Sequence, residues 1–127
     1  MPAEEALAEL ARHTFDYHAG HPFFVRLIMN ENLLHGAHIA AVTGIQQRNR
    51  SVIATISDIV ARGVEAKVFR DGIDPLSLHL SMSALCFHYV ANRYTLRANF
   101  GVDFDDAGAR TRRREEIVDA VLTLVRR

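Results

Sequence analysis

The chain has 127 residues, of which 49% are hydrophobic and 24% are charged, and this balance excludes an intrinsically disordered protein. Fifteen basic side chains are matched by fifteen acidic ones, so no net charge attracts the chain to nucleic acid or to an anionic membrane. The length is that of one domain with one core, which we place at residues 1–127.

The first half of the chain predicts helices separated by glycines. The first helix covers about residues 2–18, where apolar side chains recur at spacings of three and four, and it ends before Gly20. Pro22 suits the first turn of a second helix, because N–H groups in that turn have no acceptor within the helix and proline lacks only such a group. Gly36 ends this helix. A short helical turn at about residues 37–42 then leads to a long helix at about residues 45–65.

The second half predicts two further long helices. Asp74 and Pro75 form a strong helix start, because an Asp side chain accepts free backbone N–H groups while proline presets the first turn. This helix runs to about residue 99, and an acidic loop around Gly101 separates it from a last helix at about residues 107–126. Strand signals are absent, so we expect more than about 65% helix, and an all-α antiparallel bundle of five to six helices.

The helix that begins at Asp74 carries two apolar stripes on roughly opposite sides. One comprises Leu78, Met82, Leu85, Tyr89, Leu96 and Phe100, and the other comprises Leu76, Leu80, Phe87, Ala91, Tyr94 and Ala98. One stripe can face the core of the chain, and the other needs a second cover because an open apolar face marks an interaction surface. The last helix also has a broad apolar face, and we therefore expect a two-fold symmetric homodimer.

A third stripe on the same helix is small or polar at every position. It comprises Ser77, Ser81, Ala84, His88, Asn92, Thr95 and Asn99. This stripe is compatible with solvent, with an interface or with the wall of a ligand cavity, and the sequence alone leaves the three open.

Catalytic and metal motifs are lacking, so the sequence indicates neither an enzyme nor a bound cofactor. Glu31 and His35 lie one helical turn apart with His38 nearby, but the chain has no Glu-x-x-His pair of the kind that di-iron helical bundles use. No nucleophile elbow, phosphate loop or dinucleotide-binding loop occurs, and Cys86 and His88 point to different sides of a helix. The basic run at residues 110–114 is flanked by acids and is interpreted as a solvated helix face.

Cellular location is indicated by what the chain lacks. The single cysteine cannot close an intrachain disulfide, the first residues carry acids where a signal peptide needs bases, and no run of about eighteen apolar residues occurs. We expect a cytoplasmic protein without membrane contacts.

The order of elements resembles the carboxy-terminal domain of TetR-family transcriptional regulators over nearly the whole chain. The stretches that carry the resemblance are residues 21–27 (His-Pro-Phe-Phe-Val-Arg-Leu), the short helix after Gly36, and residues 61–63 (Ala-Arg-Gly) leading through residues 68–70 (Val-Phe-Arg) to the helix start at Asp74. The resemblance implies a small-molecule sensor whose earlier helices enclose an effector and whose last two long helices pair with those of a second subunit.

The resemblance also implies residue roles. Candidate effector contacts are Phe24, Leu27, Asn30, Glu31, Leu34, Leu85, Tyr89 and Asn92. Candidate dimer contacts are Leu80, Phe87, Tyr94, Ile117, Val121, Leu122 and Val125. The effector itself is an unidentified small molecule. From their residue type alone, Arg26, Arg93 and Arg97 could anchor a carboxylate, but arginines on long helices more often lie along the surface with the charge in water.

The chain departs from the family in one respect, because the helix-turn-helix head has no counterpart before Met1-Pro2-Ala3. DNA binding is therefore expected only through a head outside this sequence. Other classes remain open: a small helical-bundle enzyme, whose titratable groups would converge in a cleft, or a metal-binding protein, and a pure dimerisation module without ligand, which would be packed solid.

Overall fold

A computed structural model describes all 127 residues and shows an all-α chain. Its elements are α1 (Ala3–Gly20), α2 (Pro22–Leu33), the short 3-10 turn η1 (Ile39–Ala41), α3 (Ile45–Glu65), α4 (Pro75–Ala91), α5 (Arg93–Phe100) and α6 (Ala107–Val125). Helices cover 77% of the residues and there is no sheet, which confirms the predicted fold class. No helix is both long enough and apolar enough to cross a bilayer.

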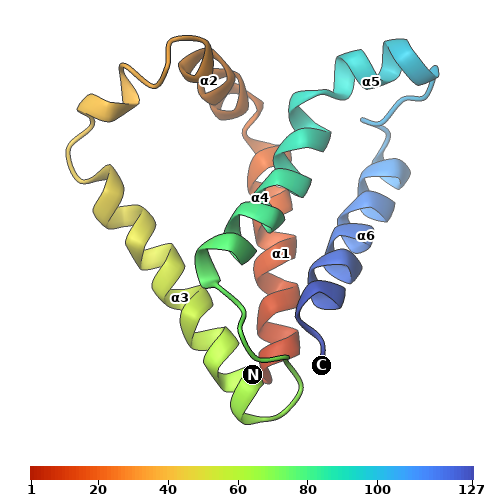
Figure 1. The fold of residues 1–127 in the computed structure, drawn as a ribbon. Coiled ribbons are helices and arrows are strands. Elements are labelled where there is room, and N and C mark those ends of the chain that lie inside the picture. Colours follow the sequence, from red (N-terminus) through yellow and green to blue (C-terminus); the bar gives the residue numbers. More distant parts are fainter.

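The helices form a bundle that is closed at one end and open at the other (Figure 1). α1 packs against α3, α4 and α6, while α2 contacts α1 and α4. α3 diverges from the rest of the bundle towards α2 and η1, and both termini lie at the closed end (Figure 1). Two hollows lie on this side of the bundle, one between α3 and the start of α4 and one between α2 and η1, and we call the region that contains both the opening.

Two aspartates begin the last long helices. The Asp74 carboxylate accepts a hydrogen bond from the Ser77 N–H at 2.9 Å, with Pro75 at the first helical position, and this confirms the predicted start of α4. Asp106 likewise accepts from the N–H groups of Gly108 and Ala109 at the start of α6.

The helix predicted from Asp74 to about Asn99 is divided at Asn92, so this part of the prediction is wrong. The Asn92 side chain donates to the His88 carbonyl at 3.1 Å, and the Thr95 hydroxyl donates to the Asn92 carbonyl at 3.0 Å. Short polar side chains that bond to nearby backbone groups compete with the helical ladder. This local competition separates α5 from α4.

The core lies between α1, α3, α4 and α6. Side chains that are completely or almost completely buried there include Leu7, Ile56, Phe69, Met82, Cys86, Ile117, Val121 and Val125. Each large apolar side chain buried in this way stabilises the fold by about 1.5–3 kcal/mol.

Four of the predicted dimer contacts belong to this core, which corrects their assignment. Ile117, Val121, Leu122 and Val125 lie on the face of α6 that packs inside the chain's own bundle. A buried side chain is not available to a second copy. The apolar face of the last helix therefore serves the fold of one subunit.

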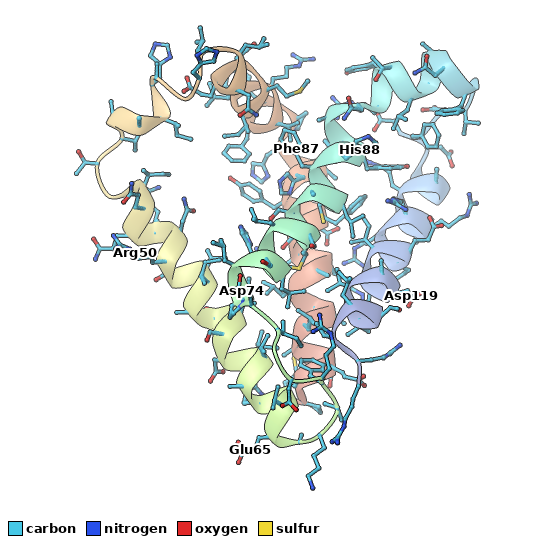
Figure 2. The ribbon with its side chains drawn as sticks, viewed as in Figure 1. Arg50, Glu65, Asp74, Phe87, His88 and Asp119 are labelled. Carbon is cyan, nitrogen blue, oxygen red and sulfur yellow. The ribbon has the colours of Figure 1, made fainter.

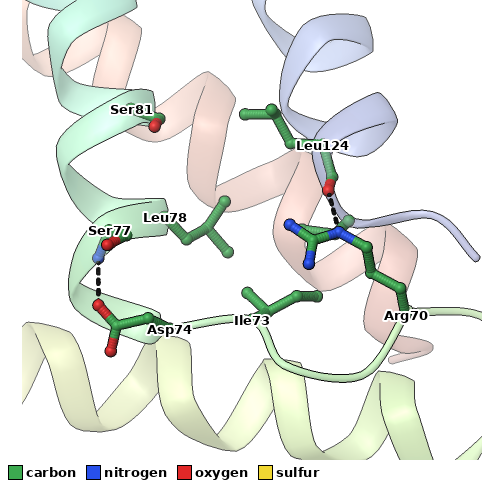
Figure 3. A pocket seen from close by; sticks show the side chains of 8 residues that line it. Arg70, Ile73, Asp74, Ser77, Leu78, Ser81 and Leu124 are labelled. Atoms are coloured by element: carbon green, nitrogen blue, oxygen red, sulfur yellow. Dashed lines mark hydrogen bonds between the residues drawn. The ribbon is translucent and has the colours of Figure 1, made fainter.

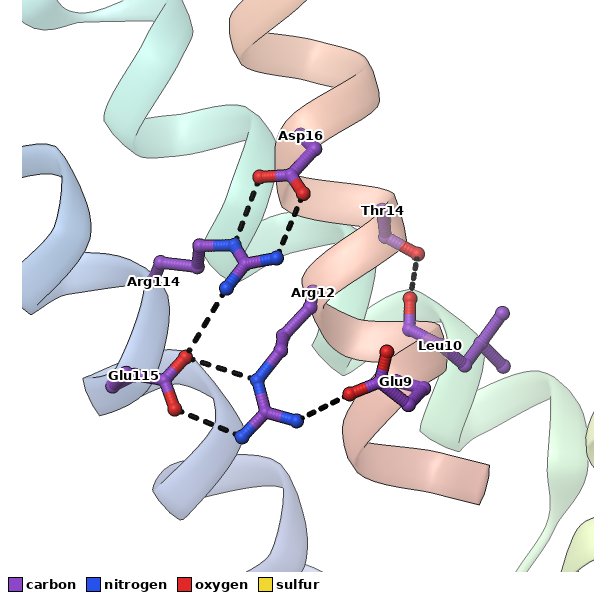
Figure 4. A network of polar contacts seen from close by, with 7 residues as sticks. All are labelled: Glu9, Leu10, Arg12, Thr14, Asp16, Arg114 and Glu115. Atoms are coloured by element: carbon purple, nitrogen blue, oxygen red, sulfur yellow. Dashed lines mark hydrogen bonds and ion pairs between the residues drawn. The ribbon is translucent and has the colours of Figure 1, made fainter. Parts of the chain in front are cut away.

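Ion pairs fix α6 against α1 (Figure 4). Arg12 donates to both oxygens of Glu115, at 2.8 and 3.0 Å, and Arg114 donates to both oxygens of Asp16, at 2.8 and 2.9 Å. Each exposed ion pair adds little stability, but two bidentate arginine–carboxylate pairs restrict the sliding of α6 along α1. The basic run of α6 is thus partly engaged with α1.

The segment between α3 and α4 closes the lower end of the bundle. Phe69 is buried against Gly63 of α3, and the Arg70 N–H donates to the Val125 carbonyl at 2.8 Å. The Arg70 guanidinium also donates to the Leu124 carbonyl at 2.9 Å. These contacts attach the segment after α3 both to α3 and to the end of α6.

Candidate functional site

The second apolar stripe of α4 faces the opening. Leu76 and Leu80 are 50% and 59% exposed, and Leu76 borders a groove between α3 and α4. Phe87 and His88 lie on different sides of α4 (Figure 2), and the centroids of the Phe87 and His18 rings are 6.0 Å apart in an edge-on arrangement. At these positions, the stripe that we expected to form the dimer seam therefore faces α1 and α3.

The groove between α3 and the start of α4 has a volume of about 610 Å³. Figure 2 shows Arg50 and Asp74 on its two sides. Its walls also include polar side chains of α3, and it is open to solvent. Its lining residues are Gln46, Asn49, Arg50, Ile53, Ala54, Ser57, Asp74, Pro75 and Leu76.

A smaller and more apolar hollow lies between α2 and η1. Its volume is about 170 Å³, and it is lined by Phe24, Leu27, Ile28, Glu31, His38, Ile39 and Val42. Three of the predicted effector contacts, Phe24, Leu27 and Glu31, are brought together here. The positions Phe24, Leu27 and Glu31 share one face of α2 because they follow one another at helical spacing.

Glu31 is the only charged residue that the fold buries. Its carboxylate accepts three hydrogen bonds: from the Ile39 N–H at 2.9 Å, from the His38 N–H at 3.1 Å and from the His38 imidazole Nδ1 at 2.9 Å. The bond from Ile39, followed in importance by those from His38, lowers the pKa of Glu31 against the opposing effect of burial. The carboxylate thus stays ionised and holds η1 against α2.

Aromatic contacts connect this hollow to α4. The Phe24 ring lies 6.5 Å from the His18 ring, which in turn meets Phe87 of α4, and Tyr17 approaches Phe24 at 5.5 Å. A ligand that displaced Phe24 would therefore press on side chains that touch α4.

The other predicted effector contacts do not line this hollow. Asn30 and Leu34 are exposed on α2 and beyond its end. Leu85 packs against the core, and the Asn92 amide donates to the carbonyl of His88 at the end of α4. Tyr89 is buried between Phe15 and Phe104, and its hydroxyl donates to the Phe104 carbonyl, so it serves the core on the α6 side.

The hollow also contains residues that we did not predict. Ile28 lies one helical turn from Phe24, so its position was accessible to sequence reasoning. Ile39 and Val42 belong to the turn that folds back on α2, where the Ile39 N–H donates to the Glu31 carboxylate. No local sequence pattern predicts that this turn folds back on the preceding helix.

The small and polar stripe of α4 lies beside α6 on the outer side of the bundle. Ser77 and Ser81 border a shallow hollow of about 90 Å³ together with Leu124 of α6 (Figure 3). Further along, His88 borders a hollow with Arg112 and Glu116 of α6. We call the surface formed by Ser77, Ser81, Ala84 and His88 of α4 with Glu116, Ala120 and Leu124 of α6 the outer face; all seven residues are exposed.

The carboxylate and imidazole side chains do not gather in groups of three or more around a possible metal position. Burial raises the pKa of the Cys86 thiol to about 12, so the thiolate needed for nucleophilic chemistry is disfavoured.

Comparison with known proteins identifies the family. The sequence profile described as "Tetracyclin repressor-like, C-terminal domain" matches residues 3–121. The chain is also 32% identical, over 124 residues, to the "HTH-type transcriptional repressor NicS" of Pseudomonas putida. That alignment covers 98% of this chain and 58% of the relative, so the chain spans little more than half of the relative's length. The chain belongs to the family of tetracycline repressor-like carboxy-terminal domains.

Proposed function

We propose that this chain is the effector-sensing and dimerisation domain of a transcriptional repressor that acts in the cytoplasm. The observation that carries the proposal is that α4 has uncovered surface on two sides: an apolar lining at the opening, and the outer face shared with α6. A sensor needs one surface for a ligand and another for a partner. The family match and the relative's name as a repressor support a regulatory role rather than a catalytic one.

The total exposed area supports the idea that both surfaces have occupants. By the scaling found for compact monomers, a chain of 14.3 kDa exposes roughly 6,800 Å². This chain exposes 8226 Å², which exceeds that value by roughly 1,400 Å². A dimer interface of standard size buries about 800 Å² on each partner, so the excess leaves room for a dimer contact and for a covered opening.

The effector site is placed at the opening. Ligand cavities in proteins are mostly apolar with a few well-placed polar groups, and the hollow beside Phe24 and Glu31 has this composition. The wider groove at Leu76 adds space on the side of α3. A pure dimerisation module would have no use for these hollows.

The dimer seam is placed at the outer face. Small side chains such as Ser77, Ser81 and Ala84 let helices approach closely, and a two-fold axis makes such a surface its own complement. This proposal replaces the predicted seam through Leu80 and Phe87, because the Phe87 ring packs against His18 of α1 and Leu80 shares its stripe with Leu76, which borders α3.

In the whole protein, we infer, a helix-turn-helix segment of the kind named in the relative contacts DNA. α4 borders both the opening and the outer face, so a ligand that shifts α4 also shifts the geometry of the dimer. Ligand binding would then alter the spacing between the two DNA-binding segments. This is coupling through one shared rigid element.

A thermal-denaturation screen of small apolar and aromatic compounds tests the sensing role. An effector should raise the melting temperature of the wild-type chain and lose this effect in Leu27→Ala, which enlarges the hollow. Phe100→Ala is the matched control, because Phe100 is exposed on α5 and lies outside the hollow. Two results would contradict an effector site at α2. Either the compounds raise the melting temperatures of both variants equally, or no compound raises the melting temperature of any of the three chains.

A further inference from the structure

Glu31 lacks a permanent counter-charge although it is buried. Its residue is 8% exposed, and its ionic contact is with His38, whose side chain is 77% exposed. No lysine or arginine forms an ion pair with it. Unlike a lysine or an arginine, a histidine is not a permanent cation, so no fixed positive charge of the fold is paired with the buried carboxylate. Buried charges are costly unless they are paired.

The carboxylate also has bonding capacity left. An ionised carboxylate can accept about four hydrogen bonds, and the Glu31 carboxylate accepts three. Two of them, from the backbone of His38 and Ile39, reach Oε2, whereas Oε1 accepts only from the imidazole of His38. Oε1 can therefore accept from a ligand, either beside the imidazole or in its place.

The rest of the hollow suits a small hydrocarbon body. Its volume of about 170 Å³ is close to that of a cavity of roughly 150 Å³ that holds benzene. Its walls are the apolar side chains of α2 and of the η1 turn, and Phe24 contributes an aromatic ring. Aromatic rings attract cations that lie over their faces.

We propose that this hollow binds a small organic cation, namely a single ring or a short branched hydrocarbon that carries one ammonium-type group. The positive group binds Oε1 of Glu31, and the hydrocarbon lies against Phe24 and Leu27. The inference rests on the proposed effector-sensing function and specifies the chemical class of its ligand. The ion pair formed with the ligand supplies the counter-charge that the fold does not provide.

The segment that covers the hollow, residues 37–43, is bounded at both ends by residues with left-handed backbone, and we call it the strap. His35 and Gly36 precede η1 with φ values of 56° and 73°, and Gly44 follows it with a φ of 80°. Left-handed residues are local reversals of the chain, so the strap between them changes direction at both ends. A cation that replaces the His38 imidazole on Glu31 removes one of the three bonds that hold this strap.

Titration of the 127-residue chain with three matched probes tests the proposal. Benzylamine, benzyl alcohol and benzoate share a ring but carry a positive, a neutral and a negative group. Calorimetry should show one site for benzylamine, weaker binding of benzyl alcohol and no binding of benzoate. Glu31→Gln should weaken benzylamine about tenfold or more, the value of a charged hydrogen bond, and leave benzyl alcohol unchanged.

Glu115→Gln is the matched control, because Glu115 is also a carboxylate with a lowered pKa but lies on α6 beside Arg12. It should bind benzylamine as the wild type does. Should Glu31→Gln fail to fold, His38→Ala decides, because it keeps the carboxylate and removes its competitor. Benzylamine should then bind with equal or higher affinity, and a loss of affinity would overturn the proposal.

The outcomes separate this inference from the proposed function. Binding of benzoate or benzyl alcohol at least as tight as that of benzylamine, or unchanged binding of benzylamine to Glu31→Gln, refutes the cationic class and leaves the sensing role standing. If none of the three probes binds, the inference fails, and the broader compound screen then judges the sensing role by itself.

Discussion

Cys86 illustrates how burial determines the chemistry of a single residue. Its side chain is fully enclosed by the core, and burial raises the pKa of its thiol to about 12. Thiol reagents attack the thiolate, which is scarce at such a pKa.

We predict that Cys86 reacts with a disulfide reagent at pH 8 far more slowly in the folded chain than in urea. The expected difference is about a hundredfold or more, because reaction requires opening of the core. Absorbance of the released thiolate measures both rates. Labelling of the native chain as fast as that of the unfolded chain would contradict the placement of Cys86 in the core.

Two carboxylates should make the fold sensitive to acid. The pKa of Glu31 is lowered mainly by the Ile39 N–H, and the pKa of Glu115 mainly by the hydrogen bonds of Arg12. A folded-state pKa below the unfolded value of about 4.3 gives stability that is present above pH 4.3 and is lost as pH falls through the folded value. The melting temperature should hold from pH 7 to about pH 5 and fall below about pH 4.

The variant Glu31→Gln isolates one of these contributions. It should melt at a lower temperature than the wild type at pH 7 and show a shallower loss between about pH 4 and pH 3, because one titrating group is gone. Thermal melts followed by circular dichroism give both quantities. An identical acid dependence in the variant and the wild type would show that the Glu31 contacts do not stabilise the fold.

At the scale of elements, sequence reasoning found the helices and missed one break. Capping by Asp74, the proline at position 22 and the glycines at 36 and 101 mark helix ends through local chemistry, and such signals are readable in a sequence. The interruption at Asn92 coincides with a side-chain amide that bonds to the backbone carbonyl of His88 and so competes with the helical pattern. Apolar periodicity continues across it and conceals the break.

Gly63 tests the packing of α3 at the closed end. A methyl group added at Gly63 would lie 2.0 Å from the buried Phe69 ring, so the segment after α3 would have to move. We expect Gly63→Ala to lower the free energy of unfolding by about 3 kcal/mol. Gly20→Ala is the control, since nothing lies within 4 Å of the added methyl group and the residue is helical.

Urea denaturation of both variants provides the measurement. Gly20→Ala should leave stability unchanged or raise it by up to about 1 kcal/mol, as alanine favours helix over glycine. Equal midpoints for Gly63→Ala and the wild type would mean that Phe69 does not pack against α3.

At the scale of the molecule, the sequence predicted which apolar faces need a cover, but not whether each face is covered by the same chain or by a second copy. It identified two apolar stripes on α4 and a broad apolar face on α6, and it assigned the second stripe and the α6 face to a dimer. Periodicity shows that side chains such as Val121 share a face, but it does not show whether that face meets the same chain or another. Leu76 borders a groove because α3 diverges from α4, and the position of α3 is set by contacts between residues that are distant in sequence.

The central claim is that α4 serves an effector on one side and a second subunit on the other. Sedimentation equilibrium of three chains tests it: the wild type, Ser81→Arg on the outer face and Leu80→Asp on the side of the opening. At low micromolar concentration the wild type and Leu80→Asp should sediment with twice the 14.3 kDa mass of one chain, and Ser81→Arg as a monomer. A monomeric wild type, or a dimer that Leu80→Asp dissociates and Ser81→Arg does not, would contradict the account.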